Sequence, residues 1–509
     1  MNYADLFRVT LPETALEVAA LLVLVADLAF LRRAALKTRV AVAALLGILG
    51  CAAALFLLPS AGGNGFSFAD DLLLASGGFA SIAQVGVLAL TILTLLLFVG
   101  STFTRHAGEY VAVVLMAAAG GLLICAAQDL LIIFVGLELL SLGLYILTAF
   151  NKHSAQSAEA ALKYYLFGGM SAAFLLFGFS YFYGLTGSTN LNRIFTALAS
   201  GNAGASPLLL VAIVLVITGL GFKVAAVPFH LWAPDAYEGA PAPAAAFIAS
   251  VSKVASFTLL LNFGLSNQHL LLSQSEGLAK SNAYPGLLHF QTEWSSVLWL
   301  VAALSLVVGN LAALAQVSVR RLLAYSAIAH AGYVLLGVPR SGAGVSPFAG
   351  GTQAAVLYYA ITYGLTTIAA FGAISVVERA TGSDKLDAFL GLHKRNPLLA
   401  AVLLVSFLSL AGIPPLVGFW AKFNLFAAVL TVGAGPVPFA LVALALAMSA
   451  VSFYYYLQVL KRVYVMPAVD ETPIVAHPVT LLTLVAIALA IVAFGCFPAI
   501  LENWIAAAF

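Results

Sequence analysis

Four ionisable side chains lie in the middle of long apolar runs, where a charge is costly. Glu138 stands in the run DLLIIFVGLELLSLGLYIL, and Lys223, Lys253 and Lys422 each stand in a further apolar run. A charge at the centre of a membrane helix costs about 2.5 to 3.5 kcal/mol. Four unpaired groups would together cost about 10 kcal/mol, which is comparable to the stability of a whole domain. We therefore expect these side chains to be paired or hydrated, and to mark a path for ions or protons.

The excess of lysines over carboxylates favours titration rather than simple ion pairing. A further lysine, Lys163, opens another apolar run, so the lysines of these runs outnumber Glu138. Low dielectric favours a neutral lysine, whereas a neighbouring carboxylate favours the charged form. Moving Glu138 closer to or further from a lysine would therefore switch that lysine, which is the physics of a gated proton step. The alternative is a set of structural ion pairs, with Lys163 reaching to the interface from its helix end.

Prolines interrupt two of the apolar runs close to a lysine. Pro228 follows Lys223 by five residues, and Pro414 and Pro415 precede Lys422 in the stretch GIPPLVGFWAKF. Proline inside a helix removes a backbone hydrogen bond and kinks or breaks the helix. Non-helical backbone at membrane depth is tolerated only where it lines a cavity or is buried in protein. The two interruptions predict an ion site at each, and the alternative is a pair of simple proline kinks.

His230 and His330 are candidate relay groups, because imidazole titrates near neutral pH. His230 stands two residues beyond the first proline interruption. His330 falls opposite Glu138 when residues 129–143, DLLIIFVGLELLSLG, are aligned with residues 321–335, RLLAYSAIAHAGYVL. Each histidine could equally be a polar group whose hydrogen bonds are satisfied and which has no part in transport.

The composition places the chain in a membrane. It is 63% hydrophobic and only 8% charged over 509 residues, with a mean hydropathy of +1.06. A soluble domain carries roughly 25% charged residues. Long apolar runs bounded by charge predict an all-α integral membrane protein rather than a barrel. The N-terminal sequence lacks a basic segment and a small-residue cleavage site, so we expect the first run to be a retained helix.

Fourteen apolar segments each approach or exceed the roughly 20 residues that span a bilayer. The twelfth is too long for one pass and contains the double proline, so we predict one broken helix there. The seventh contains Pro228 and is predicted to be broken as well. The segments are 13–31, 40–59, 79–101, 109–127, 128–150, 163–185, 206–230, 241–265, 296–315, 321–338, 352–378, 398–430, 438–461 and 478–500.

The distribution of Lys and Arg supports the count of fourteen. With the odd-numbered loops on the cytoplasmic side, fourteen cations lie inside, four lie outside and four lie within apolar segments. Arg320 and Arg321 belong to the inside set. Cytoplasmic loops of membrane proteins carry an excess of Lys and Arg. The bias therefore predicts both termini on the outer, periplasmic side.

Broken helices 7 and 12 stand in corresponding places of two halves, which is typical of an inverted repeat. We therefore predict two such repeats between an N-terminal group of helices and one final helix. The predicted parts are 1–104 with helices 1–3, 105–265 with helices 4–8, 266–465 with helices 9–13, and 466–509 with helix 14.

Several activities are unexpected on sequence grounds. Cys51, Cys125 and Cys496 show no metal or redox spacing, so we expect no disulfide, zinc or iron–sulfur site. The loops are too short for a soluble catalytic domain, and they contain no phosphate-binding glycine motif. We expect neither a cofactor nor a metal in this chain, and a lipid bilayer rather than a nucleic acid around it.

Five stretches resemble the antiporter-like membrane subunits of respiratory complex I, over roughly residues 105 to 465. Within that family the chain looks most like the subunit N branch of bacterial NADH:quinone oxidoreductase, the equivalent of mitochondrial subunit 2. KYYLFGG and the lysine at position 422, where the subunit M branch has glutamate, carry the likeness to this branch. The five stretches are GLELLSLGLYIL, KYYLFGGMSAAFLLFGFSYFYGLTGS, GFKVAAVPFHLWAPDAYEGAPAPAAAFIASVSKVASF, RLLAYSAIAHAGYVLLG and LSLAGIPPLVGFWAKF.

The resemblance implies a role for each buried ionisable residue. Glu138 would face Lys223, the lysine of the first broken helix. Lys253 would pass the proton along the membrane midplane, and Lys422 would serve the opposite half-channel. Lys163 would tune the Glu138–Lys223 pair.

The resemblance also implies a function: a proton-translocating membrane subunit of NADH:quinone oxidoreductase in the bacterial plasma (inner) membrane. FMN, iron–sulfur clusters and quinone would lie on partner subunits, beside neighbouring antiporter-like and small membrane subunits. This chain would then have no redox active site. The alternative from another class is a subunit of a multisubunit cation/proton antiporter, or a stand-alone secondary cation/proton antiporter. A membrane scaffold without transport is the third possibility.

Overall fold

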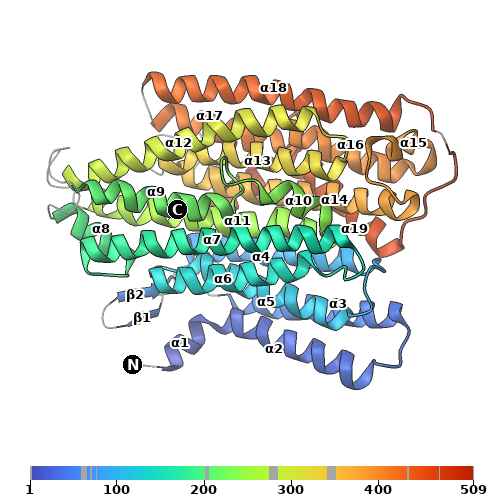
Figure 1. Ribbon diagram of the computed structural model, residues 1–509, viewed down its shortest axis with the longest axis horizontal. Helices are drawn as coiled ribbons and strands as arrows, with labels where there is room; N and C mark the ends of the chain where they lie inside the picture. Colours follow the sequence, from blue (N-terminus) through green and yellow to red (C-terminus); the bar gives the residue numbers. More distant parts are fainter. Residues whose placement is uncertain are drawn as a thin grey trace.

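The apolar runs form helices because a membrane interior offers no hydrogen-bond partner to free backbone groups. The computed structural model describes the chain over 3–58, 66–68, 71–75, 77–200, 206–273, 285–340, 351–432, 435–468 and 470–507. The helices run side by side along the long axis of the molecule (Figure 1). Strands in these described ranges are limited to one antiparallel pair, β1 (Phe66–Phe68) and β2 (Asp71–Leu74).

Ten helices of the described chain are long and apolar enough to cross a membrane. Each corresponds to one predicted segment. They are α3 (Leu36–Leu57), α4 (Gly78–Phe98), α5 (Ala107–Ala126), α6 (Leu130–Thr148), α7 (Ala155–Thr186), α11 (Ala242–Ser273), α12 (Pro285–Leu314), α14 (Gly351–Thr381), α18 (Pro436–Tyr464) and α19 (Pro478–Cys496).

The other four predicted segments are also helical. Two are continuous: α2 (Leu11–Val25), extended by the π-helical turn η1 (Ala26–Phe30), and α13 (Val319–Gly337). The other two are interrupted, as the prolines predict. They are α9 (Pro207–Lys223) followed by α10 (Trp232–Gly239), and α16 (Pro397–Ala411) followed by α17 (Val417–Val432).

In the described ranges, six short helical elements lie outside these segments. Most of them begin or end a connection between two long helices. They are α1 (Tyr3–Val9), α8 (Leu191–Ser200), η3 (Val338–Arg340), η4 (Leu386–Phe389), α15 (Leu392–Arg395) and α20 (Pro498–Ala506).

Some boundaries differ from those predicted. Lys163 lies well inside α7 rather than at the start of a helix, because the polar residues before it continue the helix from Ala155. The predicted outer loop 266–295 is shorter, since α11 continues to Ser273 and α12 begins at Pro285. The predicted repeat boundary at 265/266 therefore falls within α11. Lys280 lies outside the described residues.

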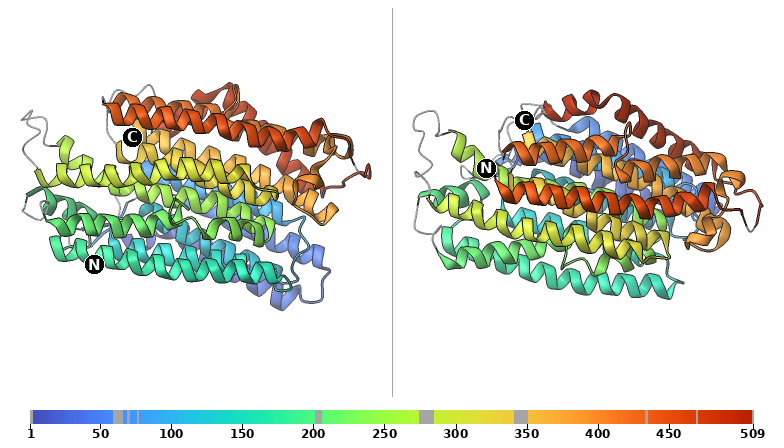
Figure 2. Two further views of the ribbon diagram at one scale, coloured as in Figure 1. Left: turned by 45° about the horizontal axis from the view of Figure 1, so that its top comes forward. Right: turned by 90° about the horizontal axis from the view of Figure 1, so that it is seen from above.

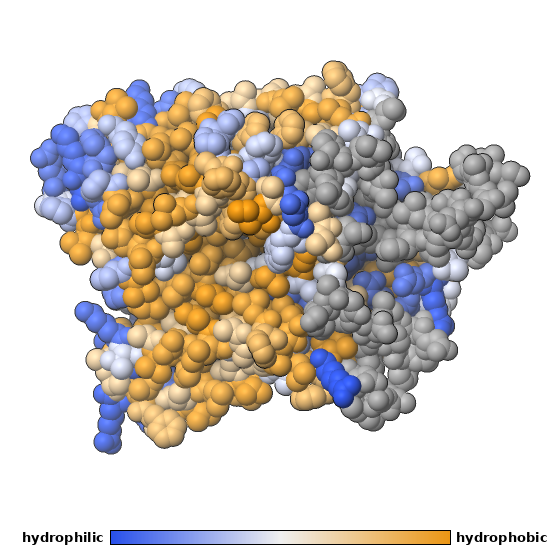
Figure 3. Space-filling model, turned by 180° about the vertical axis from the view of Figure 1, so that it is seen from behind, coloured by the Kyte–Doolittle hydropathy of each residue, from blue (hydrophilic) through white to orange (hydrophobic). Residues whose placement is uncertain are grey.

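The two ends of the bundle differ. The N and C marks lie at one end, together with α8 and the small sheet, and α15 lies at the opposite end (Figures 1 and 2). Seen from behind, a broad apolar surface covers the middle of the molecule, and hydrophilic residues gather towards the ends (Figure 3). This distribution is the one a membrane-spanning bundle needs.

The N-terminal helices are fastened to the rest by buried polar contacts. Arg39 of α3 donates to both carboxylate oxygens of Asp27, at 2.7 and 2.6 Å. The backbone N–H of Gly108 in α5 donates to the same carboxylate at 3.2 Å. Nearer the start of α2, the buried Glu13 accepts a 3.3 Å hydrogen bond from the Gln84 amide of α4. Paired buried charges are expected here, because unpaired ones would be costly.

The centre of the bundle is α11. Its membrane-spanning part is wholly buried, and it packs against α4, α5 and α14. A helix that is buried on every side has no lipid face, so any polar side chain on it is enclosed by protein. Lys253 lies on this helix and is 1% exposed.

Candidate functional site

The first break, residues 224–231, separates α9 from α10. Lys223 is the last residue of α9 and is buried. Ala225 has a positive φ of 58°, and the peptide bond before Pro228 is cis. The chain resumes as a helix at Trp232. The lysine therefore stands where the helix ends and free carbonyl groups begin.

Side chains from three helices satisfy the freed backbone of the first break. Lys253 of α11 donates to the Val224 carbonyl. The Trp232 indole N–H of α10 donates to the Phe222 carbonyl at 2.9 Å. From α12, the Ser305 hydroxyl accepts a 2.9 Å hydrogen bond from the backbone N–H of residue 227. The irregular backbone is thus buried in protein, which makes it tolerable at this depth.

Lys223 contacts two side chains of α6. Its ammonium lies 3.7 Å from the Glu138 carboxylate and donates to the Ser141 hydroxyl at 2.6 Å. The Lys223 side chain is 7% exposed and that of Glu138 is 28% exposed. The expected pairing of these two residues is therefore present in the geometry. The carboxylate reaches the surface of the bundle while the lysine does not.

Lys253 has a different surrounding. Among the described residues no carboxylate lies within ion-pair distance of its ammonium, whose hydrogen bond goes to the Val224 carbonyl in the first break. Lys253 and Lys223 therefore approach the same irregular segment from different helices. A carbonyl dipole stabilises an ammonium less than a carboxylate does.

The second break, residues 412–416, separates α16 from α17. Lys422 lies on α17 and donates to the Ala411 carbonyl at 3.0 Å and to the Ser449 hydroxyl at 2.8 Å. Its ammonium also lies 4.9 Å from the centre of the Tyr333 ring. Such a cation–π contact is favourable, the more so away from water. The bond between Pro414 and Pro415 is cis.

Gly412 gives the Lys422 side chain its room. This glycine has a φ of +87°, and a Cβ added to it would lie 2.9 Å from the Lys422 Cδ. Glycine alone adopts this backbone conformation without cost. The residue after α16 therefore serves both the turn and the lysine.

His330 lies on α13 and contacts hydroxyl groups of two other helices, α14 and α18. Its Nδ1 is 2.8 Å from the Tyr359 hydroxyl and its Nε2 is 3.4 Å from the Tyr456 hydroxyl. His330 also lines a small cavity together with Thr366, Ser409 and Gly418 at the second break. The histidine aligned with Glu138 thus joins hydroxyl groups instead of facing a carboxylate.

His230 lies within the first break and is partly buried. Its Nδ1 is buried, and no partner is found for it among the described residues. The contacts of Lys223 are with Glu138 and Ser141 and do not include His230. The relay role expected of His230 stays a prediction.

Lys163 is held by two carboxylates away from the Glu138–Lys223 pair. Its ammonium lies 2.7 Å from Glu159, one turn earlier on α7, and 2.9 Å from Asp235 of α10. Any tuning of the Glu138–Lys223 pair by Lys163 would therefore act at a distance, through α10.

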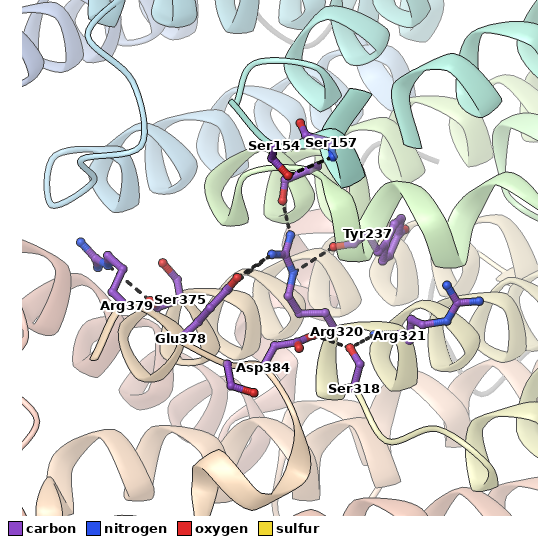
Figure 4. Close-up of polar contacts among 12 residues, drawn as sticks. Ser154, Ser157, Tyr237, Ser318, Arg320, Arg321, Ser375, Glu378, Arg379 and Asp384 are labelled. Atoms are coloured by element: carbon purple, nitrogen blue, oxygen red, sulfur yellow. Dashed lines mark hydrogen bonds and ion pairs between the residues drawn. The ribbon is translucent and has the colours of Figure 1, made fainter. Parts of the chain in front are cut away.

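Asp235, Arg320, Arg321 and Glu378 form a charged cluster that the sequence prediction missed. The two arginines were sorted with the loop cations, but Arg320 is only 4% exposed and is enclosed by α10 and α14 (Figure 4). The error arises because a cation beside an apolar run looks the same in sequence whether it faces water or protein. The spacing of Asp235 and Glu238 was a usable signal, since residues three apart share a helix face.

No group of three or more His, Cys, Asp and Glu side chains is arranged to hold a metal ion in the part of the chain that the structure describes. Cys51 and Cys125 are buried, Cys496 is exposed, and all three are free thiols. The chemistry that the buried residues support is proton transfer between lysines, a carboxylate, an imidazole and hydroxyl groups.

Fold and site together define a class of membrane protein with paired broken helices and buried lysines. The profile of the NADH:quinone oxidoreductase/Mrp antiporter transmembrane family matches residues 127–274 and 277–449. The chain belongs to this family.

Individual relatives narrow the comparison. The chain is 47% identical to NADH-quinone oxidoreductase subunit N 2 of Acidobacterium capsulatum, over 99% of both chains. It is similar to a chain in the structure of respiratory complex I from Thermus thermophilus, with a TM-score of 0.75, 34% identity, and coverage of 97% and 98%. It also shares the fold of a chain in the Mrp complex from Dietzia sp., with a TM-score of 0.74, 21% identity, and coverage of 100% and 97%.

Proposed function

We propose that this chain is a proton-translocating membrane subunit of a NADH:quinone oxidoreductase. The observation that carries the proposal is the Glu138–Lys223 pair at the first break, with Lys253 bonded to the same irregular backbone. The subunit N relative of Acidobacterium capsulatum supports the choice of complex. The resemblance adds an axis along which protons would move, from Lys223 through Lys253 to Lys422, and His330 is proposed as a relay on it because imidazole titrates near neutral pH.

The first half would work through separation of the Glu138–Lys223 pair. Two unit charges about 4 Å apart interact by about 4 kcal/mol at the effective dielectric of a protein. Moving one charge against 100 mV takes about 2.3 kcal/mol. The attraction lost when the pair at 3.7 Å separates is therefore larger than the energy needed to move a proton from Lys223 against the membrane potential.

The released proton would pass to Lys253 in its neutral amine form, since the Lys253 nitrogen reaches the first break, and then from the resulting ammonium towards His330 and Lys422. The hydroxyl groups of Tyr359 and Tyr456 at His330 can both donate and accept hydrogen bonds. Lys422 would hold the proton in the second half until it is released. Each carrier is a side chain of this chain, so proton movement along this axis needs no bound cofactor.

Partner subunits would carry the redox chemistry. NADH, FMN, the iron–sulfur clusters and the quinone would bind to them, and this chain would have no redox active site. The complex would lie in the bacterial plasma membrane. The basic loops would face the cytoplasm and both termini the periplasm, as the excess of Lys and Arg on one side predicts.

One surface of α6 suits a neighbouring membrane subunit. Glu138 is partly exposed and lies at helical spacing along a row of exposed apolar side chains: Leu131, Val135, Leu142 and Ile146. A carboxylate facing lipid would be costly. A neighbour that covers this row would shield Glu138 and could bring a charge near it, which would give the complex a means to move the pair.

The proposal is tested in the whole complex, purified in mild detergent and reconstituted into vesicles. Lys223→Ala and Lys253→Ala should each lower the number of protons taken up per NADH oxidised, while the complex still assembles. Lys37→Ala, at an exposed position in the first turn of α3, is the control and should leave the ratio unchanged. A wild-type ratio in both core variants would rule out this route.

The antiporter alternative makes a different prediction about partners. A subunit of a cation/proton antiporter should purify with small antiporter subunits and catalyse cation-driven proton movement without NADH. The proposed subunit should purify with cluster-binding and quinone-binding chains. The protein composition of the purified complex decides between the two.

A further inference from the structure

Two adjacent arginines open α13, and both contact α10 across the interface between the two halves of the chain. Arg320 donates through Nε to the Tyr237 carbonyl at 3.0 Å and through a terminal nitrogen to the Ala240 carbonyl. Its other terminal nitrogen donates to both oxygens of Glu378 on α14, at 3.1 and 3.3 Å. Figure 4 shows the guanidinium between Tyr237 and Glu378. All three nitrogens of the buried guanidinium are engaged.

The contacts of Arg320 satisfy the C-terminal end of α10. The last four carbonyl groups of a helix have no partner within the helix, and they carry partial negative charge. A cation there is favourable, and a planar guanidinium can bond several carbonyl groups at once. Arg320 therefore stabilises the C-terminal end of α10. This helix is only eight residues long and follows the first break.

Arg321 binds side chains of α10, whereas Arg320 binds its backbone. It donates to Asp235 at 2.7 Å and to Glu238 at 3.0 Å. Asp235 binds Lys163 of α7 with its second oxygen at 2.9 Å. One carboxylate of α10 therefore joins a cation from each half of the chain.

The other part of α13 leads to the second half-channel. The same helix carries His330 and then Tyr333, whose ring lies 4.9 Å from the Lys422 ammonium. At the start of α10, the Trp232 indole is bonded to the end of α9, where Lys223 stands. A short helix that is bonded at one end to Phe222, the neighbour of Lys223, and at the other end to α13 links the two lysine sites through continuous contacts.

We propose that Arg320 and Arg321 are positioning residues that couple the two half-channels by fixing α10 to α13. A shift of α10 on separation of the Glu138–Lys223 pair would move the start of α13, and with it His330 and Tyr333. This inference rests on the proposed function and adds to it residues that carry no proton. The competing explanation is that the arginines only hold the fold together.

The two arginines differ in how a lysine should replace them. Arg321→Lys keeps one charge that can still pair with Asp235 and Glu238, so coupling should be retained. Arg320→Lys loses the planar arrangement that reaches Tyr237, Ala240 and Glu378 together. It should therefore lower the proton-to-NADH ratio by at least half of the fall that Lys223→Ala causes. Arg321→Gln should lower the ratio, and Lys385→Ala, an exposed cation near the start of α13, should not.

The measurement is made on complexes matched for assembly, which is checked by gel filtration and by the amount of each subunit. A structural role alone predicts less assembled complex with a wild-type ratio, and that result would overturn the inference. So would a wild-type ratio in Arg320→Lys and Arg321→Gln while Lys223→Ala lowers it. If Lys223→Ala itself has no effect, the proposed function fails instead.

A double substitution adds a second test. Asp235→Asn and Arg321→Gln each remove the contact between these two residues, and each also removes one further ion pair, so together they should lower the ratio by less than the sum of their separate effects. Fully additive effects would mean that the two residues act separately. That result would contradict the inferred coupling of α10 to α13.

Discussion

The two helix breaks use similar backbone devices and surround their lysines differently. Each break contains a residue with positive φ, Ala225 in the first and Gly412 in the second, and each lysine donates to a serine hydroxyl. Lys223 also faces a carboxylate at 3.7 Å. Among the described residues, Lys422 has instead a carbonyl, a hydroxyl and an aromatic ring.

This difference teaches that the two lysines depend on different kinds of control. A counter-ion that reaches the bundle surface can be displaced by a neighbour, so the charge of Lys223 responds to events outside the chain. The groups around Lys422 belong to α16, α13 and α18, and among the described residues none of them is a charge that a neighbour could displace. The charge of Lys223 at the first break can therefore respond to a neighbouring subunit. Lys422 at the second break can hold a proton until water or His330 changes the surroundings of Lys422.

The largest expected effect comes from making the first break resemble the second. Glu138→Gln removes the charge and keeps the shape, so Lys223 would be left with Ser141 alone. Because the carboxylate that favours the charged form of Lys223 is lost, proton transfer through the chain should fall at least tenfold. Proton uptake per NADH in vesicles measures the effect.

Glu471→Gln is the control, since this carboxylate is exposed in the loop before α19 and pairs only loosely with Lys394 at 3.8 Å. It should behave as wild type. Unchanged proton uptake in Glu138→Gln would show that the carboxylate does not control the first break.

A second substitution crowds the lysine of the second break. Gly412→Ala places a Cβ 2.9 Å from the Lys422 Cδ and forces alanine into a left-handed conformation at a cost of about 1 to 2 kcal/mol. We expect a lower melting temperature and a several-fold loss of proton transfer.

Gly382→Ala separates these two causes. Gly382 also has a positive φ, of +71°, but nothing lies within 4 Å of an added Cβ. It should share the loss of stability and leave proton transfer unchanged. Equal proton transfer in the two variants would mean that the contact with Lys422 has no functional weight.

The smallest expected effect compares the two serines. Ser449→Ala removes one of the two hydrogen bonds of Lys422, and a hydrogen bond to a charged group is worth about 1.5 to 3 kcal/mol. Ser141→Ala leaves Lys223 its carboxylate. Proton transfer should therefore fall further in Ser449→Ala than in Ser141→Ala, and the reverse order would contradict the comparison. Single-turnover proton uptake distinguishes the two.

Hydrophobic length and proline position were enough to predict a helix in each of the fourteen segments, ten of which are long and apolar enough to cross a membrane, and both breaks, because these features are local to the chain. The Glu138–Lys223 contact was expected from the resemblance to a known family, and the geometry places the two residues together. Single-sequence patterns could not give the ends of α7 and α11, where polar residues continue the helix beyond the apolar run.

The contacts of the arginines lay beyond local reasoning for another reason. Arg320 binds carbonyl groups about eighty positions away in the chain, and a carbonyl has no sequence signature. Counting cations by loop also assumes that a charge next to an apolar run faces water. Arg39 was also counted as a loop cation, but it is paired with Asp27, which also accepts a hydrogen bond from the Gly108 backbone.

The Trp232 indole bridges the first break and stacks on Tyr164, with ring centres 4.1 Å apart. Indole emission is sensitive to hydrogen bonding and to water, so this side chain is a natural optical reporter placed beside Lys223. The chain has only five tryptophans, and replacing the other four with phenylalanine leaves one indole in this chain, whose signal is the difference between that complex and one that also carries Trp232→Phe. Time-resolved fluorescence of such a variant would record opening of the break during turnover, without an attached dye.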